Sequence, residues 1–351
     1  MPLVHTFSSI PATHLPSLIA VSPKAELHVH IEGTLEPEMA CALAERNGVA
    51  LPYADPAGMR QAMNFRCLQD FLNLYYTATA ALRTEQDFYD LAQAYLQRAA
   101  ADRVVRAEIF FDPQAHLARG VRLETVLAGL SQAIARCETD LGVSAALLMS
   151  FLRDRPVAEA HELLDAVLPF RETIIGVGLD SAEAGHPPEL FADVFARARS
   201  AGLHVVAHAG EEGPPSSITN ALDTLYAERV DHGVRCLEDV SLVQRLARQK
   251  IPLTVCPLSN VRLQVAPSLA AHPLPRMLAA GLKVSVHSDD PAYFGGYLNH
   301  TLTASAEAMS LTSHDLYVLL RNSLESTFLE PAAIASHVTK LDRCFAEAAG
   351  G

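Results

Sequence analysis

The chain has 351 residues, of which half are apolar and 19% are charged. This composition predicts a folded globular protein with a large core. The formal net charge is −13 and lysine and arginine form no cluster, so nucleic acid and membranes are not expected as partners. No stretch resembles a signal peptide or a membrane span, and the six cysteines form no CxxC pair. We therefore expect a cytoplasmic protein without disulfides or a cysteine-based zinc site.

Short apolar or β-branched segments alternate with longer segments of helical periodicity along the whole chain. Eight strands are expected, at residues 25–31, 104–111, 143–150, 174–179, 204–209, 229–231, 252–256 and 282–288. This alternation predicts an α/β protein with a single (β/α)₈ barrel of the TIM type. An open, doubly wound sheet is the alternative, because alternation alone does not show closure. No linker or repeat divides the chain, so we expect one domain over residues 1–351, with its core at about residues 24–330.

Acidic and imidazole side chains stand at or just beyond the carboxyl ends of these strands. They are His28, His30, Asp180, His208, Glu211, His232, Asp289 and Asp290. In a (β/α)₈ barrel this end carries the active site. A bound metal ion is the simplest reason for so many such groups to converge there.

His28 and His30 point to the same side of the first strand, because side chains alternate along a strand. Taken alone, the two could equally be hydrogen-bonded histidines of the core. Together with His208 and Asp289 they would supply three neutral imidazoles and one carboxylate, a set that suits Zn²⁺ with an open water position. The same ligands accept Fe²⁺, Mn²⁺ or Co²⁺ when zinc is absent.

Glu211 and His232 would act beside such a metal. Zinc lowers the pKa of its bound water to about 7, and His232 would orient or deprotonate that water. Glu211, with a raised pKa, would donate a proton to the substrate. The assembly suits hydrolysis of an amide, an ester, a phosphoester or an amidine-like ring.

Four motifs, in this order, resemble the adenosine/adenine deaminase family. They are His28-x-His30, His208-Ala-Gly-Glu211, Asp231-His232-Gly233 and Ser288-Asp289-Asp290-Pro291, and the match runs from Lys24 to about Tyr297. The zinc site of cytidine deaminases would need a PCxxC motif, which the chain lacks. The resemblance also implies a helical insert after the first strand that covers the site, and residues 65–76 have helical spacing suited to it.

The resemblance assigns functions to the motif residues. One zinc ion would be held by His28, His30, His208 and Asp289. Glu211 would protonate ring N1 while hydroxide adds to C6, and His232 would position that hydroxide. Asp290 would bond to the imidazole side of the purine, and the backbone near Gly178 would meet the base edge.

Two further carboxylates bear on the choice of substrate. Nucleoside-specific members resemble one another in carrying HxHxDG, whose Asp meets the sugar, and a glycine after the fourth strand; here Glu32 and Glu183 take these places. Both would crowd the ribose and accept a hydrogen bond from a free base, a preference of about 1–3 kcal/mol. The alternative is that both bind nearby backbone amides. Residues 109–114 and 290–297 also resemble the adenine deaminase branch.

The sequence therefore predicts zinc-dependent deamination of a small purine base, adenine, to hypoxanthine and ammonia, a reaction of purine salvage. Adenosine or an N6-substituted adenine is the alternative substrate. An inert zinc-binding barrel that acts through protein contacts is a more distant alternative, and Glu211 and His232 argue against it. A metal-dependent phosphotriesterase or an amidohydrolase of other specificity is a further alternative, but these often use a lysine that bridges two metals, and no strand-end lysine here suits that part. Whether the chain forms a homo-oligomer stays open.

Overall fold

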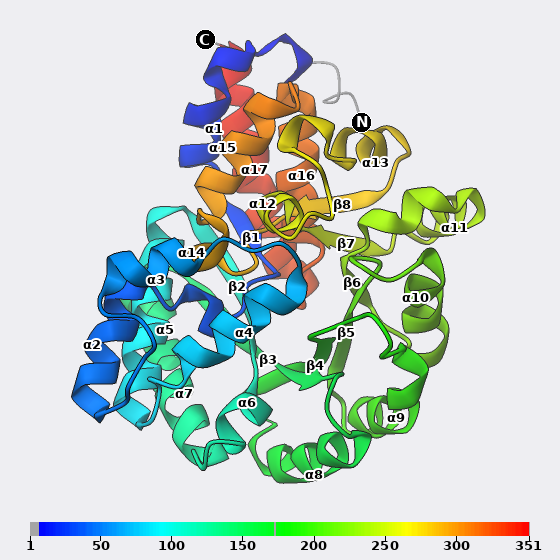
Figure 1. Cartoon of the computed structure of the whole chain (residues 1–351). Helices are drawn as coiled ribbons and strands as arrows, with labels where there is room; N and C mark the ends of the chain where they lie inside the picture. Colours follow the sequence, from blue (N-terminus) through cyan, green and yellow to red (C-terminus); the bar gives the residue numbers. More distant parts are fainter. Residues whose placement is uncertain (1–6, 172, 351) are drawn as a thin grey trace.

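Eight parallel strands form the centre of the computed structural model, which describes residues 7–171 and 173–350 (Figure 1). They follow one another in the sheet in chain order, from β1 to β8. Their bounds are β1 (Lys24–Glu26), β2 (Val104–Phe111), β3 (Ser144–Leu152), β4 (Ile174–Asp180), β5 (His204–Ala209), β6 (Arg229–His232), β7 (Pro252–Val255) and β8 (Lys283–Val286). The predicted strands all appear, with ends that differ by a few residues.

The barrel closes through the segment that follows β1. Val29 forms a parallel bridge with Asp289, and His30 forms one with Phe110 of β2. His30 N donates to Asp289 O, and Asp289 N donates to His28 O, both at 3.0 Å. The sheet is therefore closed, and the predicted (β/α)₈ barrel is confirmed.

The regular part of β1 is shorter than the predicted strand 25–31. Its ladder with β2 ends at Glu26, and the next amide, Leu27 N, donates to His287 Nδ1 at 3.1 Å. A side chain thus takes the place of a backbone partner. Residues 28–30 then pair with Asp289, just beyond β8, and with Phe110 of β2.

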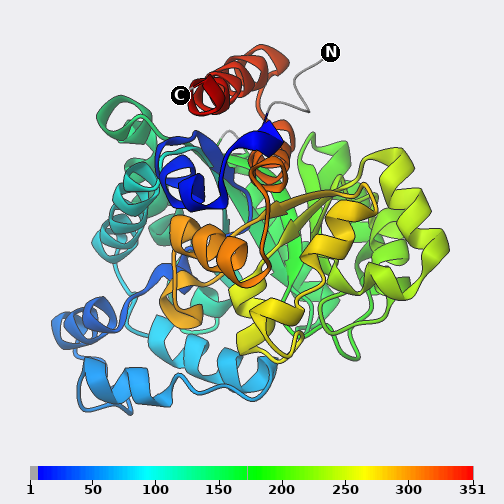
Figure 2. The ribbon, with the colours of Figure 1, turned by 90° about the horizontal axis from the view of Figure 1, so that it is seen from above.

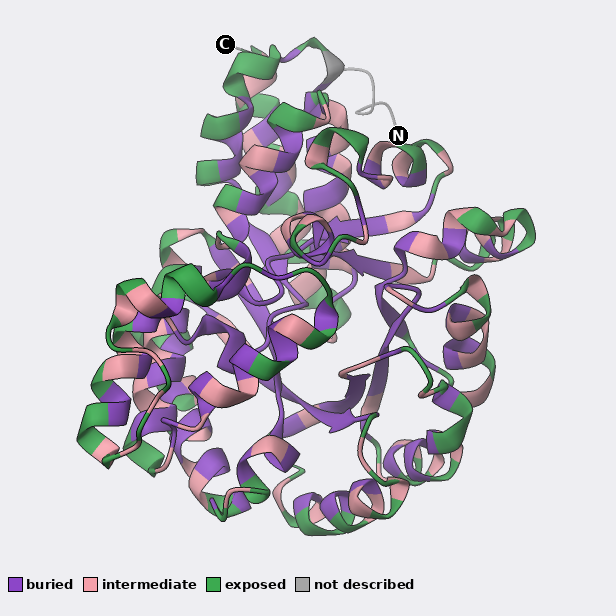
Figure 3. Ribbon diagram, viewed as in Figure 1, coloured by how far each residue is buried: buried purple, intermediate pink, exposed green. Residues whose placement is uncertain are grey.

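Helices surround the strands and bury their apolar faces against them, so that the strands are buried and the outer helix faces are exposed (Figure 3). The helices that follow β2 to β8 are α6 (Pro113–Leu117), α7 (Leu123–Leu141), α8 (Val157–Val167), α9 (Ala192–Ser200), α10 (Pro215–Asn220), α11 (Val240–Gln249), α12 (Pro257–Arg262), α13 (Leu274–Ala279), α14 (Pro291–Phe294), α15 (Leu298–Ala308), α16 (Ser313–Glu325) and α17 (Pro331–Gly350). Helix α1 (Leu15–Val21) precedes β1. None of the described helices is long and apolar enough to cross a bilayer.

A helical insert separates β1 from β2, as predicted. It consists of α2 (Pro37–Asn47), α3 (Pro56–Ala62), α4 (Leu68–Thr79) and α5 (Glu85–Ala101). Helix α4 crosses in front of the barrel in Figure 1, and Figure 2 shows the insert and α17 on opposite sides of the molecule. The insert therefore covers one end of the barrel. The extent of the domain, residues 1–351, stays a prediction, since residues 1–6, 172 and 351 lie outside the described part.

Helix α2 shows how the local sequence sets these boundaries. Pro37 occupies its first turn, where a missing N–H costs nothing, and Gly48 caps it with a left-handed φ of 63°. Helix α5 begins at a capping box in which Thr84 and Asp87 each accept from the other's backbone N–H.

A buried ion pair lies inside the barrel, near the amino-terminal ends of the strands. Arg229 Nη1 donates to Glu108 Oε2 at 2.7 Å and to Ser326 O at 3.2 Å. Glu108 Oε1 accepts from Phe328 N at 2.7 Å. Both side chains of the pair are fully buried, and Arg106 Nε also donates to Glu108 Oε1 at 3.2 Å. Buried charges of this kind need such partners to be tolerated.

Replacing Arg229 with Met should lower the free energy of unfolding by about 1.5–3 kcal/mol, because the buried Glu108 loses its shortest charged donor and keeps Arg106 Nε at 3.2 Å. Arg245→Met is the matched control, since Arg245 pairs with the exposed Asp223 at the surface. That substitution should cost about 1 kcal/mol or less. Denaturant unfolding of both variants measures the difference, and equal losses would contradict the contribution of the buried ion pair.

Candidate active site

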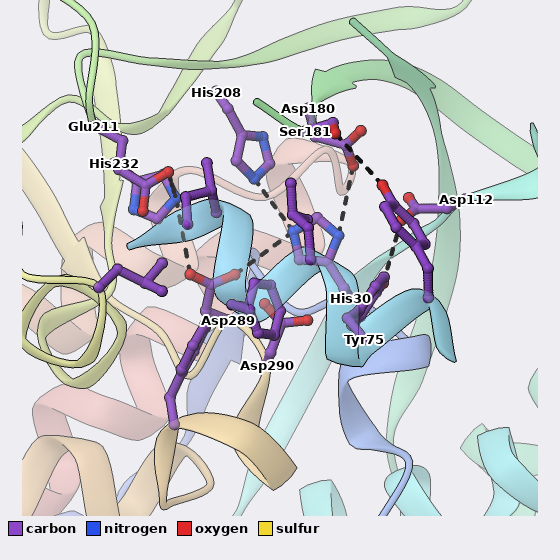
Figure 4. Close-up of a pocket in the computed structure, with 16 residues that line it drawn as sticks. His30, Tyr75, Asp112, Asp180, Ser181, His208, Glu211, His232, Asp289 and Asp290 are labelled. Carbon is purple, nitrogen blue, oxygen red and sulfur yellow. Dashed lines mark hydrogen bonds and ion pairs between the residues drawn. The ribbon is translucent and has the colours of Figure 1, made fainter. Parts of the chain in front are cut away.

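A cavity lies under α4 at the carboxyl ends of the strands (Figure 4). The space inside it that water-sized molecules can occupy is about 40 Å³. Polar groups line its floor and apolar groups line its roof. The lining residues are His30, Leu68, Phe71, Leu72, Tyr75, Tyr76, Asp112, Asp180, Ser181, His208, Glu211, His232, Leu263, Asp289, Asp290 and Phe294.

Four residues at the floor form a ligand cluster: His28, His30, His208 and Asp289. Each offers one ligand atom, all four atoms lie within 4.8 Å of one another, and all four residues are buried. His28 Nε2 lies 3.3 Å from Asp289 Oδ1, and His30 Nε2 lies 3.2 Å from His208 Nε2.

The ligand cluster fits a divalent cation by its own geometry. His28 Nε2 is buried and has no hydrogen-bond partner among the described residues, although it points at the other three groups. Three imidazole nitrogens gathered around one carboxylate oxygen are a donor set typical of Zn²⁺. The structure thus brings together the four residues that the sequence proposed as ligands.

Backbone conformation helps to direct these side chains. Asp289 has a φ of 63° and His232 a φ of 62°, in the left-handed region that non-glycine residues rarely adopt. Each lies at the end of a parallel strand and turns its side chain into the cavity. The hydrogen bonds that close the barrel, between Asp289 and the backbone of His28 and His30, hold one of these two conformations in place.

A second group of residues orients the imidazoles of the ligand cluster. His28 Nδ1 lies 3.0 Å from Thr254 Oγ1 and 3.2 Å from Thr254 O, and Thr254 Oγ1 donates to Asp231 Oδ1 at 2.7 Å. His208 Nδ1 lies 3.5 Å from Asp231 Oδ2. Such partners direct the Nε2 lone pair of a histidine toward a metal. The sequence included Asp231 in a motif without assigning it this position.

Burial keeps the imidazoles of His30 and His208 ready to bind a cation. The pKa of His28 is instead raised, because the lowering effect of its burial is outweighed by Asp289 and Asp231. Burial lowers the pKa of His30 to about 3, with a smaller effect of the same sign from His28. Burial also lowers the pKa of His208 well below its usual range, with His28 adding to the effect. Both rings are therefore neutral at pH 7, the form that binds metal.

Glu211 and His232 lie next to the ligand cluster. His232 Nε2 lies 3.5 Å from Glu211 Oε2 and 3.8 Å from Asp289 Oδ2. Burial raises the pKa of Glu211 well above its usual range, and Asp289 adds to the shift. The raised pKa favours the protonated form of Glu211, the form that a general acid needs.

A chain of hydrogen bonds sets the tautomer of His232. Leu274 N donates to His272 Nδ1 at 3.1 Å, so His272 donates from Nε2 to Asn260 Oδ1, also at 3.1 Å. Asn260 Nδ2 then donates to His232 Nδ1 at 3.3 Å. Because burial lowers the pKa of His232 to about 3, the neutral ring carries its proton on Nε2, facing the cavity. No sequence pattern pointed to Asn260 or His272.

Glu183 lies outside the lining of the cavity. Its carboxylate accepts from four successive backbone amides, Gly210 N at 2.8 Å, Glu211 N at 3.1 Å, Glu212 N at 3.0 Å and Gly213 N at 2.7 Å. These are the contacts of the alternative interpretation, in which the carboxylate binds nearby amides. Glu183 thus fixes the turn that carries Glu211, and a Cβ on Gly213 would lie 2.3 Å from its Oε1.

Glu32 and Gly178 also lie outside the lining. Glu32 Oε1 accepts from Asp112 N at 3.1 Å and lies 2.8 Å from His116 Nε2. Gly178, in β4, lies behind Phe110, whose ring would be 3.0 Å from a Cβ at that position. Direct contact of either residue with a base stays a prediction.

Asp290 lies in the lining as the sequence proposed, and its Oδ1 is buried without a hydrogen-bond partner in the described part of the chain. Burial raises its pKa well above the usual range, and Asp289 adds to the shift. Gly33 packs against it so closely that a Cβ would lie 2.0 Å from Asp290 Oδ1.

Several lining residues were not proposed as site residues from the sequence. Asp112 follows β2 and Asp180 ends β4, and Tyr75, Tyr76 and Ser181 lie beside them. Tyr75 donates from its hydroxyl to Asp112 Oδ2 at 3.2 Å. Burial raises the pKa of Asp112 to about 8, and Glu32 adds to the shift. Among these residues, only Asp180 had been noted in the sequence, as a carboxylate at the end of a strand.

A (β/α)₈ barrel with a buried histidine–aspartate cluster and an adjacent acid at its carboxyl end defines a class of metal-dependent hydrolases. The adenosine deaminase family model matches residues 23–341. The chain belongs to the adenosine deaminase family and is thus an enzyme of the deaminase class.

Its relatives point to one branch of the family. The chain is 56% identical over 326 residues to a protein of Rhodospirillum rubrum named adenine deaminase, covering 93% of this chain and 98% of that one. It is similar to the crystal structure of adenine deaminase from Arthrobacter aurescens, with a TM-score of 0.91, 52% identity and coverage of 92% and 99%. An amidohydrolase from Burkholderia ambifaria with bound Zn has a TM-score of 0.87, 27% identity and coverage of 98% and 96%.

Loading metal-free protein with Zn²⁺ should raise its midpoint of thermal unfolding by about 5 °C or more, because a saturating ligand stabilises the folded state by several kcal/mol. Asp289→Ala and His208→Ala should each abolish this shift. His14→Ala, at an exposed histidine, is the control and should keep it. A full shift in either cluster variant would show that the cation binds elsewhere.

Proposed function

We propose that this chain is a zinc-dependent hydrolase that deaminates adenine to hypoxanthine and ammonia. The observation that carries the proposal is the position of Glu211, a buried acid with a raised pKa, beside the ligand cluster in one small cavity. The names of the relatives, at more than half identity over most of the chain, support adenine as the substrate. The reaction would serve purine salvage in the cytoplasm.

One zinc ion per chain would be held by the ligand cluster. Bound there, zinc would lower the pKa of a water to about 7 and so provide a nucleophile at neutral pH. His28, His30 and His208 would remain neutral, and Asp289 would contribute the one negative charge. The second carboxylate oxygen of Asp289, 3.8 Å from His232 Nε2, would link the ligand cluster to that imidazole.

Glu211 would act as the general acid toward the purine ring. Its carboxyl group keeps a proton because its pKa is raised, and transfer of this proton to N1 would make C6 more electrophilic. His232 would donate its Nε2–H to the attacking oxygen and hold it toward C6. The hydrogen-bond chain through Asn260 supports a donor at this position, rather than a base.

Asp290 would hold the five-membered ring. Its raised pKa favours the protonated form, which would donate a hydrogen bond to N7 of adenine. Its free Oδ1 is the group available for that bond. Together, Glu211 and Asp290 would fix the plane of the base over the ligand cluster.

The test is ammonia release from adenine, adenosine and N6-methyladenine by the zinc-loaded protein, followed by ultraviolet absorbance. Adenine should exceed adenosine in kcat/KM by about 10²-fold or more. A faster reaction with adenosine or with N6-methyladenine would overturn the choice of substrate, and no reaction with any of them would overturn the proposed activity.

The proton donor is tested by Glu211→Gln, which should lower kcat about 10²–10⁴-fold while zinc stays bound. Glu212→Gln is the matched control, because Glu212 occupies the same turn and lies outside the lining of the cavity. Near-normal turnover by Glu211→Gln would show that another group protonates the base.

A further inference from the structure

Two carboxyl groups of the cavity have no function in the proposed chemistry. Asp112 and Asp180, here called the acid pair, lie at the carboxyl ends of β2 and β4, and each residue is only 3% exposed. They lie on the far side of His30 from Glu211 and His232 (Figure 4). One oxygen of each lies within 4.8 Å of the other and of a His30 nitrogen.

The acid pair presents oxygen atoms without hydrogen-bond partners to the cavity. Asp180 Oδ2 lies 3.6 Å from His30 Nδ1, and Ser150 and Asp112 lie close enough to Asp180 to affect its pKa. Even so, both oxygens of Asp180 and Oδ1 of Asp112 are buried and have no hydrogen bond of ordinary geometry to a described residue. Burying such a group without a partner is unfavourable, so a native protein seldom keeps one unless a ligand or ordered water completes it. The acid pair therefore points to a bound molecule that donates hydrogen bonds.

Other carboxylates of this rim lie outside the cavity, although Glu32 Oε2 is also buried without a hydrogen-bond partner among the described residues. Glu183 accepts from four backbone amides, and Glu32 Oε1 accepts from Asp112 N and contacts His116. Neither lies in the lining of the cavity. The acceptor for a free-base N–H must therefore be sought elsewhere.

We propose that Asp112 and Asp180 form the subsite that accepts the N9–H hydrogen bond of a free purine base and so selects the base over its nucleoside. The inference rests on the proposed function, since it uses the same orientation of the base. With N1 at Glu211 and N7 at Asp290, the remaining polar edge of the ring, N3 and N9–H, is directed away from those two groups. The acid pair is the unpartnered acceptor on that side.

The roof of the cavity supports the same selection. Tyr75 donates to Asp112 Oδ2 at 3.2 Å, and the Tyr76 hydroxyl lies 3.4 Å from Ser181 Oγ, the residue after Asp180. Helix α4 thus contacts Asp112 directly and, next to Asp180, contacts Ser181. A sugar on N9 would have to displace these tyrosines, whereas a hydrogen atom would not.

A second cation is the competing occupant, because the potential ligand atoms of His30, Asp112 and Asp180 also lie close enough together to hold a metal ion. We favour the base, since His30 Nε2 already faces the ligand cluster and a further ion on Nδ1 would require a doubly bound ring. The ratio of zinc to protein tests this difference directly.

The experiment compares adenine with 9-methyladenine, which lacks the N9–H, in zinc-loaded wild-type protein and in Asp112→Ala and Asp180→Ala. In the wild type, kcat/KM for 9-methyladenine should be about 10²-fold or more below that for adenine. In each variant, kcat/KM for adenine should fall about 10–100-fold while that for 9-methyladenine stays equal or rises. The ratio of the two substrates should therefore approach one.

Asp154→Ala is the matched control, because Asp154 lies just beyond β3, between the acid pair's strands, and is exposed. It acts on Asp112 only through its charge and should leave both substrates unchanged. Calorimetric binding of adenine and 9-methyladenine to the Glu211→Gln protein gives a second readout that does not depend on turnover. Adenine should bind about 10-fold or more tightly than 9-methyladenine, because only adenine supplies the N9–H donor.

Three results would overturn the subsite. They are equal kcat/KM for the two substrates in the wild type, unchanged adenine turnover in both acid-pair variants, and two zinc ions per chain that fall to one in Asp180→Ala. Absence of adenine turnover in the wild type itself would instead contradict the proposed function. In that case the binding comparison still decides whether the acid pair recognises the N9–H.

Discussion

The closure of the barrel between the segment after β1 and the end of β8 is the constraint on which the site depends. Two backbone hydrogen bonds, His30 N to Asp289 O and Asp289 N to His28 O, join these segments. The same residues supply three of the four ligand atoms of the cluster. The bonds that complete the fold therefore also assemble the proposed metal site, and any change in register at this seam would separate the ligands.

The carboxylates of the rim divide into two groups by whether they line the cavity, since buried oxygens without hydrogen-bond partners occur in both groups. Glu183, Glu32 and Asp231 accept from amides, histidines or a hydroxyl, and they hold loops and imidazoles in place. Glu211, Asp290, Asp112 and Asp180 line the cavity, and each keeps at least one buried oxygen that no described residue contacts through a hydrogen bond. We infer that the first group positions the site and that the second group contacts the substrate, with a proton donor and a base-recognising subsite at opposite sides of His30.

The ligand cluster could be predicted from the sequence because alternation along a strand and the carboxyl-end rule are local. His28 and His30 share a side of their segment, and His208 and Asp289 lie at strand ends that a closed barrel must bring together. The fold followed from similar local patterns, whereas the insert after β1 was implied by the family resemblance.

Which rim carboxylates line the cavity, and which instead hold loops and imidazoles in place, could not be predicted in the same way. Whether Glu183 reaches a base or the amides of residues 210–213 depends on how two loops pack, and the sequence carries no local signal for this. The same holds for Asn260, which bonds to His232 of β6, and for His272, which bonds to Asn260. Asp180 was visible as a strand-end carboxylate, but its unpartnered oxygens appear only once the cavity is formed.

A crystal structure of the Glu211→Gln protein with zinc and adenine, with diffraction recorded at the zinc absorption edge, tests the central claim most directly. One anomalous peak should lie among His28, His30, His208 and Asp289, with C6 of the base above it and N9 within hydrogen-bond distance of Asp112 or Asp180. A peak between His30 and the acid pair, or a base whose N9 is directed toward residue 211, would contradict the proposed metal site and base orientation.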